Sequence, residues 1–239
     1  METKTDEIAD GVYRFSTAVS GIGPEPFTFN QFLIDADAPL LFHLGHRGFF
    51  PSISAAVAKV TPLARIRYLA FGHVEADECG ALNHWLAAAP SAEVVHSRLA
   101  CQVSLNDLAD RPPRPLDDGE AVDLGGRKMR WIDTPHVPHG WEAGAMYEET
   151  HRTLFCGDLL THGGDGPPIT EADITGQACA MEDMFHAMTM APGTAATLRA
   201  LADLSPTTLA LMHGSSYRGD GAGALRRLAD YCAGAISPA

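Results

Sequence analysis

The stretch that decides the fold is residues 66–71 (IRYLAF) followed by residues 73–80 (HVEADECG). The first part is an apolar run typical of a buried strand, and the second places His73, Glu75 and Asp77 at alternating positions directly after it. In α/β proteins, ligands gather at the carboxyl ends of strands, where loops are free to carry polar side chains. A lone His-x-Glu-x-Asp also fits an ordinary solvated turn, so the rest of the chain has to decide.

The same arrangement recurs at the ends of three other predicted strands. His136, Asp158 and His213 each follow an apolar run directly or within a few residues. Neutral imidazole and ionised carboxylate are the nitrogen and oxygen donors that a divalent metal ion prefers. We therefore expect these strand ends to converge on one metal site. His139, three residues further on, is the alternative to His136 as the ligand from this loop.

Alternating and continuous apolar segments give a coarse map of the chain. Strands are predicted at 11–17, 27–35, 39–44, 66–72, 93–96, 119–124, 128–133, 144–149, 152–157 and 207–212. Helices are predicted at 51–60, 79–89, 97–108, 176–190, 193–204 and 221–234. This order indicates a mixed α/β (α+β) domain, with one sheet or a pair of sheets covered by helices. Residues 161–175 are rich in Gly and Pro and form the candidate lid.

The composition excludes several classes of protein. The chain has 239 residues, with 17 Lys plus Arg against 30 Asp plus Glu, which gives a formal charge of −13. Such a charge disfavours binding to nucleic acid or to a membrane surface. The acidic start resembles no signal peptide, and no apolar run approaches the roughly 20 residues of a membrane span. We expect a soluble cytoplasmic protein whose five cysteines are free thiols.

On these motifs the chain resembles the metallo-β-lactamase superfamily, and His-x-Glu-x-Asp resembles its flavodiiron branch. Residues 212–219 (MHGSSYRG) are similar to the stand-alone oxygen-binding diiron proteins (ODP) of that branch. The resemblance implies a four-layer αββα sandwich, with residues 1–239 as a single domain and a dinuclear site along one edge of the sheets. Hydrolytic members carry a second histidine where this chain has Glu75, and a carboxylate there shifts the preference from zinc towards iron.

The resemblance also implies a set of ligands. It places His73, Glu75 and His136 on one metal, Asp77 and His213 on the other, and Asp158 between the two. The flavodiiron motif usually continues with a histidine after the aspartate, where this chain has Glu78. Two interpretations of Glu78 stay open: it ligates the second metal, or it points away as an acidic residue at the start of a helix.

Other candidate residues are assigned simpler roles. His46 and His162 follow strand ends and are candidates for contacts around the metals rather than for ligands. Cys79 is interpreted as a structural thiol rather than a redox switch. The methionines at helical spacing (Met181, Met184 and Met188) are interpreted as a core face, with the wall of a gas-binding pocket as the alternative.

The functional hypothesis is a non-haem diiron protein that binds dioxygen or nitric oxide, with two iron ions as cofactors and zinc or manganese as substitutes. A length of 239 residues suffices for the diiron domain but leaves no room for a flavin module. We therefore expect a separate redox partner or a signalling receptor, oxygen binding rather than fast reduction, and a homodimer. Whether the protein is an oxygen or nitric oxide reductase is left open.

Two rival functions remain. The first is a dinuclear zinc hydrolase of the same fold that acts on an ester, thioester or lactone. The second is a metal-dependent interaction protein. Glu75 argues against the hydrolase, because a carboxylate stands where the hydrolytic members carry histidine.

Overall fold

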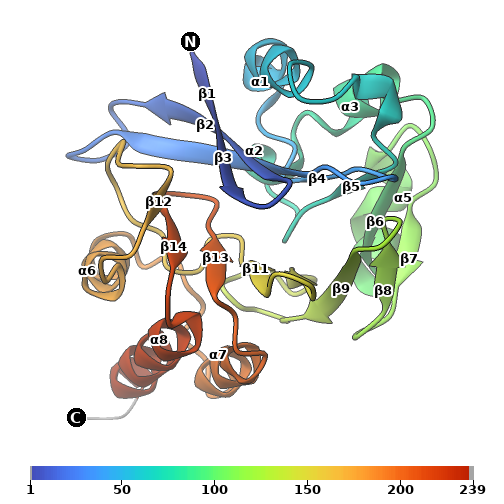
Figure 1. The fold of residues 1–239 in the computed structure, drawn as a ribbon. Coiled ribbons are helices and arrows are strands. Elements are labelled where there is room, and N and C mark those ends of the chain that lie inside the picture. The colour runs from blue at the N-terminus through green and yellow to red at the C-terminus, as the bar shows by residue number, and fades with distance from the viewer. Residues whose placement is uncertain (1, 237–239) are drawn as a thin grey trace.

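Two seven-stranded sheets lie face to face, with helices on both outer sides (Figure 1). The structure, a computed structural model, describes residues 2–236. The αββα layering confirms the expected metallo-β-lactamase sandwich. Within the described residues, no helix is both long enough and apolar enough to cross a membrane.

The first sheet is built from the first half of the chain. In spatial order its strands are β1 (Thr3–Ala9), β2 (Val12–Val19), β3 (Phe27–Ile34), β4 (Leu40–Phe42), β5 (Tyr68–Ala70), β6 (Glu93–Ser97) and β7 (Arg114–Leu116). Strands β1 to β4 pair antiparallel, and β4 to β7 pair parallel. The parallel part directs the carboxyl ends of β4, β5 and β6 to one edge of the sheet.

The second sheet is built from the second half. Its strands, in spatial order, are β12 (Ile169–Thr170), β14 (Ser216–Arg218), β13 (Thr208–Ala210), β11 (Thr153–Phe155), β10 (Gly144–Glu148), β9 (Lys128–Asp133) and β8 (Ala121–Asp123). Strands β11 and β13 run parallel, so the loops that follow them leave the sheet at the same edge.

The helices divide between the two outer faces. The α-helices are α1 (Phe50–Val57), α2 (Ala76–Cys79), α3 (Leu82–Ala88), α4 (Arg98–Ala100), α5 (Asn106–Leu108), α6 (Thr175–Phe185), α7 (Thr194–Asp203) and α8 (Gly221–Ile236), with a π-helical turn at Cys101–Leu105 and 3-10 turns at Arg47–Phe49 and Leu63–Arg65. Figure 1 shows α1 and α3 beside the first sheet and α6, α7 and α8 beside the second.

Strand periodicity divides the apolar side chains among three cores. On β3, Leu33 packs towards the helices, whereas Phe32 and Ile34 pack between the sheets. Successive side chains of a strand point to opposite faces, which is why one apolar strand serves two cores. Trp131 and Phe155 of the second sheet complete the central core.

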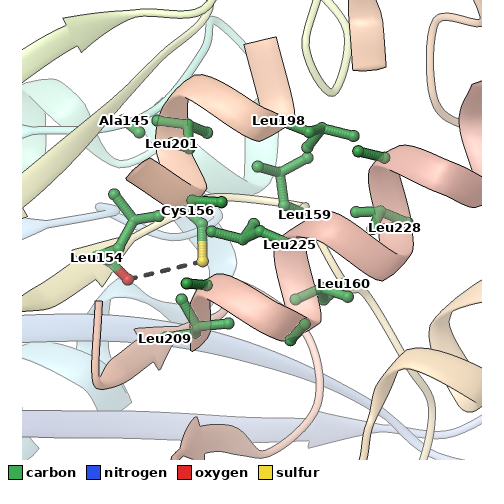
Figure 2. Close-up of a cluster of buried hydrophobic side chains, with 14 of the residues drawn as sticks. Ala145, Leu154, Cys156, Leu159, Leu160, Leu198, Leu201, Leu209, Leu225 and Leu228 are labelled. Atoms are coloured by element: carbon green, nitrogen blue, oxygen red, sulfur yellow. Dashed lines mark hydrogen bonds between the residues drawn. The ribbon is translucent and has the colours of Figure 1, made fainter. Parts of the chain in front are cut away.

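The third core lies between the second sheet and helices α7 and α8 (Figure 2). Leu198 and Leu201 of α7 and Leu225 and Leu228 of α8 are at most 1% exposed there. Burying a leucine side chain contributes about 1.5–3 kcal/mol. This packing holds α7 and α8 against the sheet whose loops carry part of the site.

Hydrogen bonds join the two sheets beside the site. The backbone N–H of Asn30 donates to the carbonyl of Met212 at 2.9 Å, and the Asn30 side chain donates to the carbonyls of Leu211 and Gly214. At another point the N–H of Gly144 donates to the carbonyl of Gly72 at 2.8 Å. The loops that follow β5 and β13 are therefore held in register across the sandwich.

Some elements differ from the sequence prediction. Strands β1, β7, β12 and β14 were not predicted, and β12 lies inside the candidate lid at 161–175. The helix predicted at 176–190 ends at Phe185. His186 takes a left-handed conformation with φ of 51°, and the carboxylate of Glu182 accepts the N–H groups of Ala187 and Met188. These bonds cap the end of α6 and turn the chain.

Candidate metal centre

The loop after β5 carries three acidic residues in three different settings. Glu75 is extended and immediately precedes α2, which contains Asp77 and Glu78. Consecutive residues of a helix point about 100° apart, so Asp77 faces the pocket while Glu78 faces the interior. The N–H of Val74 donates to Oε1 of Glu142 at 3.0 Å, which fixes this loop against the segment that connects β9 and β10.

Four side chains form the first cluster of potential ligands. Their donor atoms, on His73, Glu75, His139 and Asp158, lie within 4.8 Å of one another. Oε2 of Glu75 lies 2.8 Å from Nε2 of His73 and 3.1 Å from Nε2 of His139. Oδ2 of Asp158 lies 3.7 Å and 3.6 Å from the same two nitrogens. Two imidazoles and two carboxylates thus face one point.

A second cluster shares Asp158 with the first. Its Oδ1 lies 3.2 Å from Nε2 of His213, and Oδ2 of Asp77 lies 3.3 Å from the same nitrogen. Nδ1 of His213 faces the carbonyl of Thr28 at 2.8 Å. A carbonyl only accepts, so Nδ1 donates a proton to it, and Nε2 is the nitrogen left available for a metal.

The structure brings His139, not His136, into the site. His136 is exposed, and its backbone is left-handed with φ of 66°. The ring of His139 packs edge-on against His73, with ring centroids 4.3 Å apart. The structure thus places His139 rather than His136 among the potential ligands, because the turn between β9 and β10 directs His136 to solvent and His139 inwards.

Glu78 lies behind His73 rather than in the pocket. Its side chain is fully buried, and Oε2 accepts the N–H groups of Gly72 at 2.6 Å and of His73 at 2.8 Å. Its Oε1 lies 3.3 Å from Nδ1 of His73, the ring nitrogen opposite the cluster. Of the two interpretations that the sequence left open, the geometry favours a Glu78 that points away from the metals.

The histidines and carboxylates of the site strongly shift one another's pKa values. Burial disfavours the protonated form of His73, but the carboxylates of Glu78, Glu75 and Asp158 outweigh burial and raise the pKa of His73 to about 12. Burial likewise opposes protonation of His213, yet Asp158 and Asp77 raise its pKa to about 10. Hydrogen bonds from His139 and His73 hold the pKa of Glu75 far below its usual range. Without a bound cation, the carboxylates thus retain protons on the histidines.

The residues fit a pair of metal ions. Asp77 Oδ1 is buried and has no hydrogen-bond partner among residues 2–236, and burying an unpaired carboxylate oxygen is costly unless a cation or water meets it. Three imidazoles and three carboxylates, with Asp158 facing both clusters, form a mixed nitrogen and oxygen donor set of the kind that non-haem iron accepts.

An apolar pocket of about 270 Å³ lies over the clusters. Its wall includes Phe27 and Phe29 of β3, Leu160 from the loop after β11, Met181 of α6 and Met188 just beyond α6. Met181 and Met188 are half-buried, and Met188 also packs against the core beside α7 and α8, whereas Met184 is 56% exposed. The methionines therefore do not form one core face: Met181 and Met188 line the pocket, which was the alternative interpretation. No Lys or Arg is among the described residues that line this pocket. The space suits a small neutral ligand.

The other candidate histidines have structural roles. The ring of His46 packs edge-on against Phe29 and Phe49. Both ring nitrogens of His162 face backbone groups, with Nε2 accepting the N–H of Ser215 at 3.0 Å. Burial raises the pKa of Cys79 to about 12, so it remains a thiol at neutral pH. Sequence reasoning missed His43, whose ring contacts Glu78 and which no spacing pattern singles out.

The sandwich defines the class of the protein as a metallo-β-lactamase fold, and this fold carries two adjoining clusters of potential metal ligands. The model of the ODP family beta lactamase matches residues 27–214, and the chain belongs to this family. The putative diflavin flavoprotein A 2 of Synechocystis sp. is 29% identical over 136 residues, which cover 56% of this chain and 23% of that protein. The match thus spans about a quarter of that relative's length.

Solved structures share the fold. Rubredoxin oxygen:oxidoreductase from Desulfovibrio gigas has a TM-score of 0.83 at 18% identity, and the match covers 96% of this chain and 62% of that one. The flavodiiron core of a Synechocystis protein has a TM-score of 0.81 at 23% identity, with coverages of 97% and 61%. The chain therefore has the fold of a flavodiiron core.

Proposed function

We propose that this chain holds two iron ions and binds dioxygen or nitric oxide beside them. The observation that carries the proposal is the position of Asp158, whose two oxygens face two separate groups of ligands beneath an apolar pocket. His73, Glu75 and His139 would complete one metal site, and Asp77 and His213 the other. Two ferrous ions held by these residues would supply electrons to a bound diatomic ligand.

The two metal sites would differ in their number of protein ligands. The His73 side offers four donor residues and the His213 side offers three, since Asp158 contributes to both. Phe27 and Phe29 pack against the ring of His213, with centroids 4.3 Å and 5.2 Å away. The metal near His213 would therefore have more open positions towards the apolar pocket, and we propose that the diatomic ligand approaches on that side.

The pocket argues against the hydrolase alternative. Anionic esters or lactones with carboxylates are usually held by Lys or Arg, and the described lining residues contain neither. Apolar walls exclude water and admit a small neutral gas. Outside the two clusters the polar lining side chains are Thr161 and Glu182, and neither offers a positive charge to a carboxylate substrate.

The direct test is anaerobic loading with ferrous iron followed by a pulse of dioxygen or nitric oxide. The proposal expects about two irons per chain, a new absorption band in the near-ultraviolet to visible range, and no ester hydrolysis. Zinc as the native metal together with hydrolytic turnover would establish the rival function.

Whether the protein reduces dioxygen or only binds it depends on a supply of electrons. Residues 2–236 all belong to one sandwich, so electrons would reach the metals from a group outside these residues. A relative from Megalodesulfovibrio gigas, 22% identical over 141 residues, is named rubredoxin-oxygen oxidoreductase. We propose a separate donor here too, with slow reduction of oxygen. Oxygen uptake measured with and without reduced rubredoxin tests this, and rapid uptake without any donor protein would contradict it.

A further inference from the structure

Beneath the metal centre, Glu78 connects two buried histidines. His43 and Glu78 are both fully buried, and Nε2 of His43 lies 3.3 Å from Oε1 of Glu78. The same oxygen lies 3.3 Å from Nδ1 of His73. A row of groups therefore runs from the central core to the first cluster of ligands, through His43, Glu78 and His73.

The carboxylate is held in a fixed orientation. Its Oε2 accepts two backbone N–H groups, of Gly72 and His73, so both lone pairs of this oxygen are used and it carries no proton. A Cβ atom at Gly72 or at Gly157 would come within 3.2 Å of the carboxylate. The backbone at these two glycines packs closely against the carboxylate of Glu78 and restricts its rotation.

This orientation determines which nitrogen of His73 is free. A carboxylate oxygen accepts but does not donate, so Nδ1 of His73 presents its proton to Glu78. Nε2, which faces Glu75 and Asp158, is then the nitrogen whose proton a cation would replace.

We propose that Glu78 is a positioning residue that fixes His73 as an Nε2 donor to the metal on the His73 side. The proposal rests on the proposed diiron function. A carboxylate hydrogen-bonded to a metal-binding histidine makes the imidazole a stronger donor and stabilises the higher oxidation state.

The decisive variant is Glu78→Gln. An amide has one oxygen, and the two backbone N–H groups require it at the Oε2 position, so the NH₂ group would face Nδ1 of His73. The proton of His73 would then move to Nε2 and oppose metal binding. We expect affinity for ferrous iron to fall about 10- to 100-fold and the reduction potential of the loaded protein to rise.

Glu148→Gln is the matched control. Glu148 is also fully buried, accepts the N–H groups of Thr150 and His151, and contacts the His151 ring at 3.2 Å. It contacts none of the residues of the two clusters. Any general cost of replacing a buried, backbone-bound glutamate appears in both variants, whereas the changes in affinity and potential are expected for Glu78→Gln only.

The experiment is an anaerobic titration with ferrous iron against a competing chelator, with potentiometry and circular dichroism on each variant. A folded Glu78→Gln protein with unchanged affinity and potential overturns the inference but leaves the proposed function intact. A wild-type chain that binds no iron overturns both. Nitrogen NMR of the wild-type protein loaded with zinc, as a diamagnetic probe, gives a test that needs no variant: a proton on Nδ1 of His73 supports the inference, and a proton on Nε2 overturns it.

Discussion

Oδ1 of Asp158 lies 3.2 Å from Nε2 of His213, while Oδ2 of the same carboxylate faces His73 and His139. One side chain from the loop after β11 therefore belongs to both clusters. Each oxygen serves a different group of donors, which is the arrangement expected of a residue that bridges two cations.

Asp158→Asn removes the charge and one of the two oxygens while keeping the size. We expect iron content to fall from about two per chain to about one or fewer, measured by elemental analysis after anaerobic loading. Asp173→Asn is the control, because Asp173 is exposed and pairs with Arg227. Retention of both irons in Asp158→Asn would show that the carboxylate does not bridge.

His139→Ala and His136→Ala form a second matched pair, only three residues apart. His139 faces Glu75 and Asp158, whereas His136 is exposed. We expect His139→Ala to weaken iron binding at least about 10-fold, since even partners of metal ligands contribute this much. His136→Ala should bind like the wild type. The reverse result would support His136 as the metal ligand, which is what the family resemblance implies.

Iron binding should release protons. The pKa of His213 is raised to about 10 and that of His73 to about 12, so both are protonated at pH 7 in the metal-free chain. A metal must displace these protons, and its affinity therefore rises with pH. We expect about two protons released per chain, measured calorimetrically in buffers of different ionisation enthalpy. Iron uptake without proton release would contradict the protonation of His73 and His213 in the metal-free chain.

The same shifts determine the stability of the metal-free chain. Protonated His73 and His213, with folded pKa values above 6.5, contribute stability below that pH, and this contribution is lost as pH rises through about 10. Glu78, with a lowered pKa, contributes above pH 4.5, and its contribution is lost in acid. Melting temperatures should thus fall at both extremes, and bound iron should remove the alkaline loss.

Leu225→Ala tests the helix layer of the second sheet. Leu225 is fully buried between α8 and the sheet (Figure 2), and the cavity should lower the free energy of unfolding by about 2–5 kcal/mol. Leu99 is 37% exposed, and Leu99→Ala should change it by less than about 0.5 kcal/mol. Urea unfolding compares the two. Equal values would mean that this layer is loosely packed.

The sequence predicts well those elements whose apolar residues form a recognisable pattern along the chain. Strand β3 is buried almost throughout because its two faces enter two cores, and its apolar residues mark it in the sequence. Strand β1 carries only Thr, Lys, Asp and Glu over its first five positions and lies at a sheet edge, where Ile8 is its one buried residue, so no apolar pattern marks it. Strand β14 has three residues, too few for a period to be recognised.

The sequence likewise predicts some residues of the site and not others. His73, Asp158 and His213 come together because each follows a strand whose carboxyl end lies at the same edge. The choice between His136 and His139 depends on the dihedral angles of one turn, which spacing does not encode. The direction of Glu78 depends on its 100° rotation from Asp77 within a helical turn, and its partner His43 lies 35 residues away along the chain.

The hydrogen bond from His213 to the carbonyl of Thr28 crosses from the second sheet to the first. His213 follows β13, whereas Glu75 and Asp77 follow β5 of the opposite sheet, so neither half of the chain possesses the site alone. Partial detachment of β13 and α8 would dismantle the centre, and cations held there would oppose that opening. Amide exchange in β13 should therefore slow on metal loading, and the rate at which metal escapes should follow the rate at which the sandwich opens.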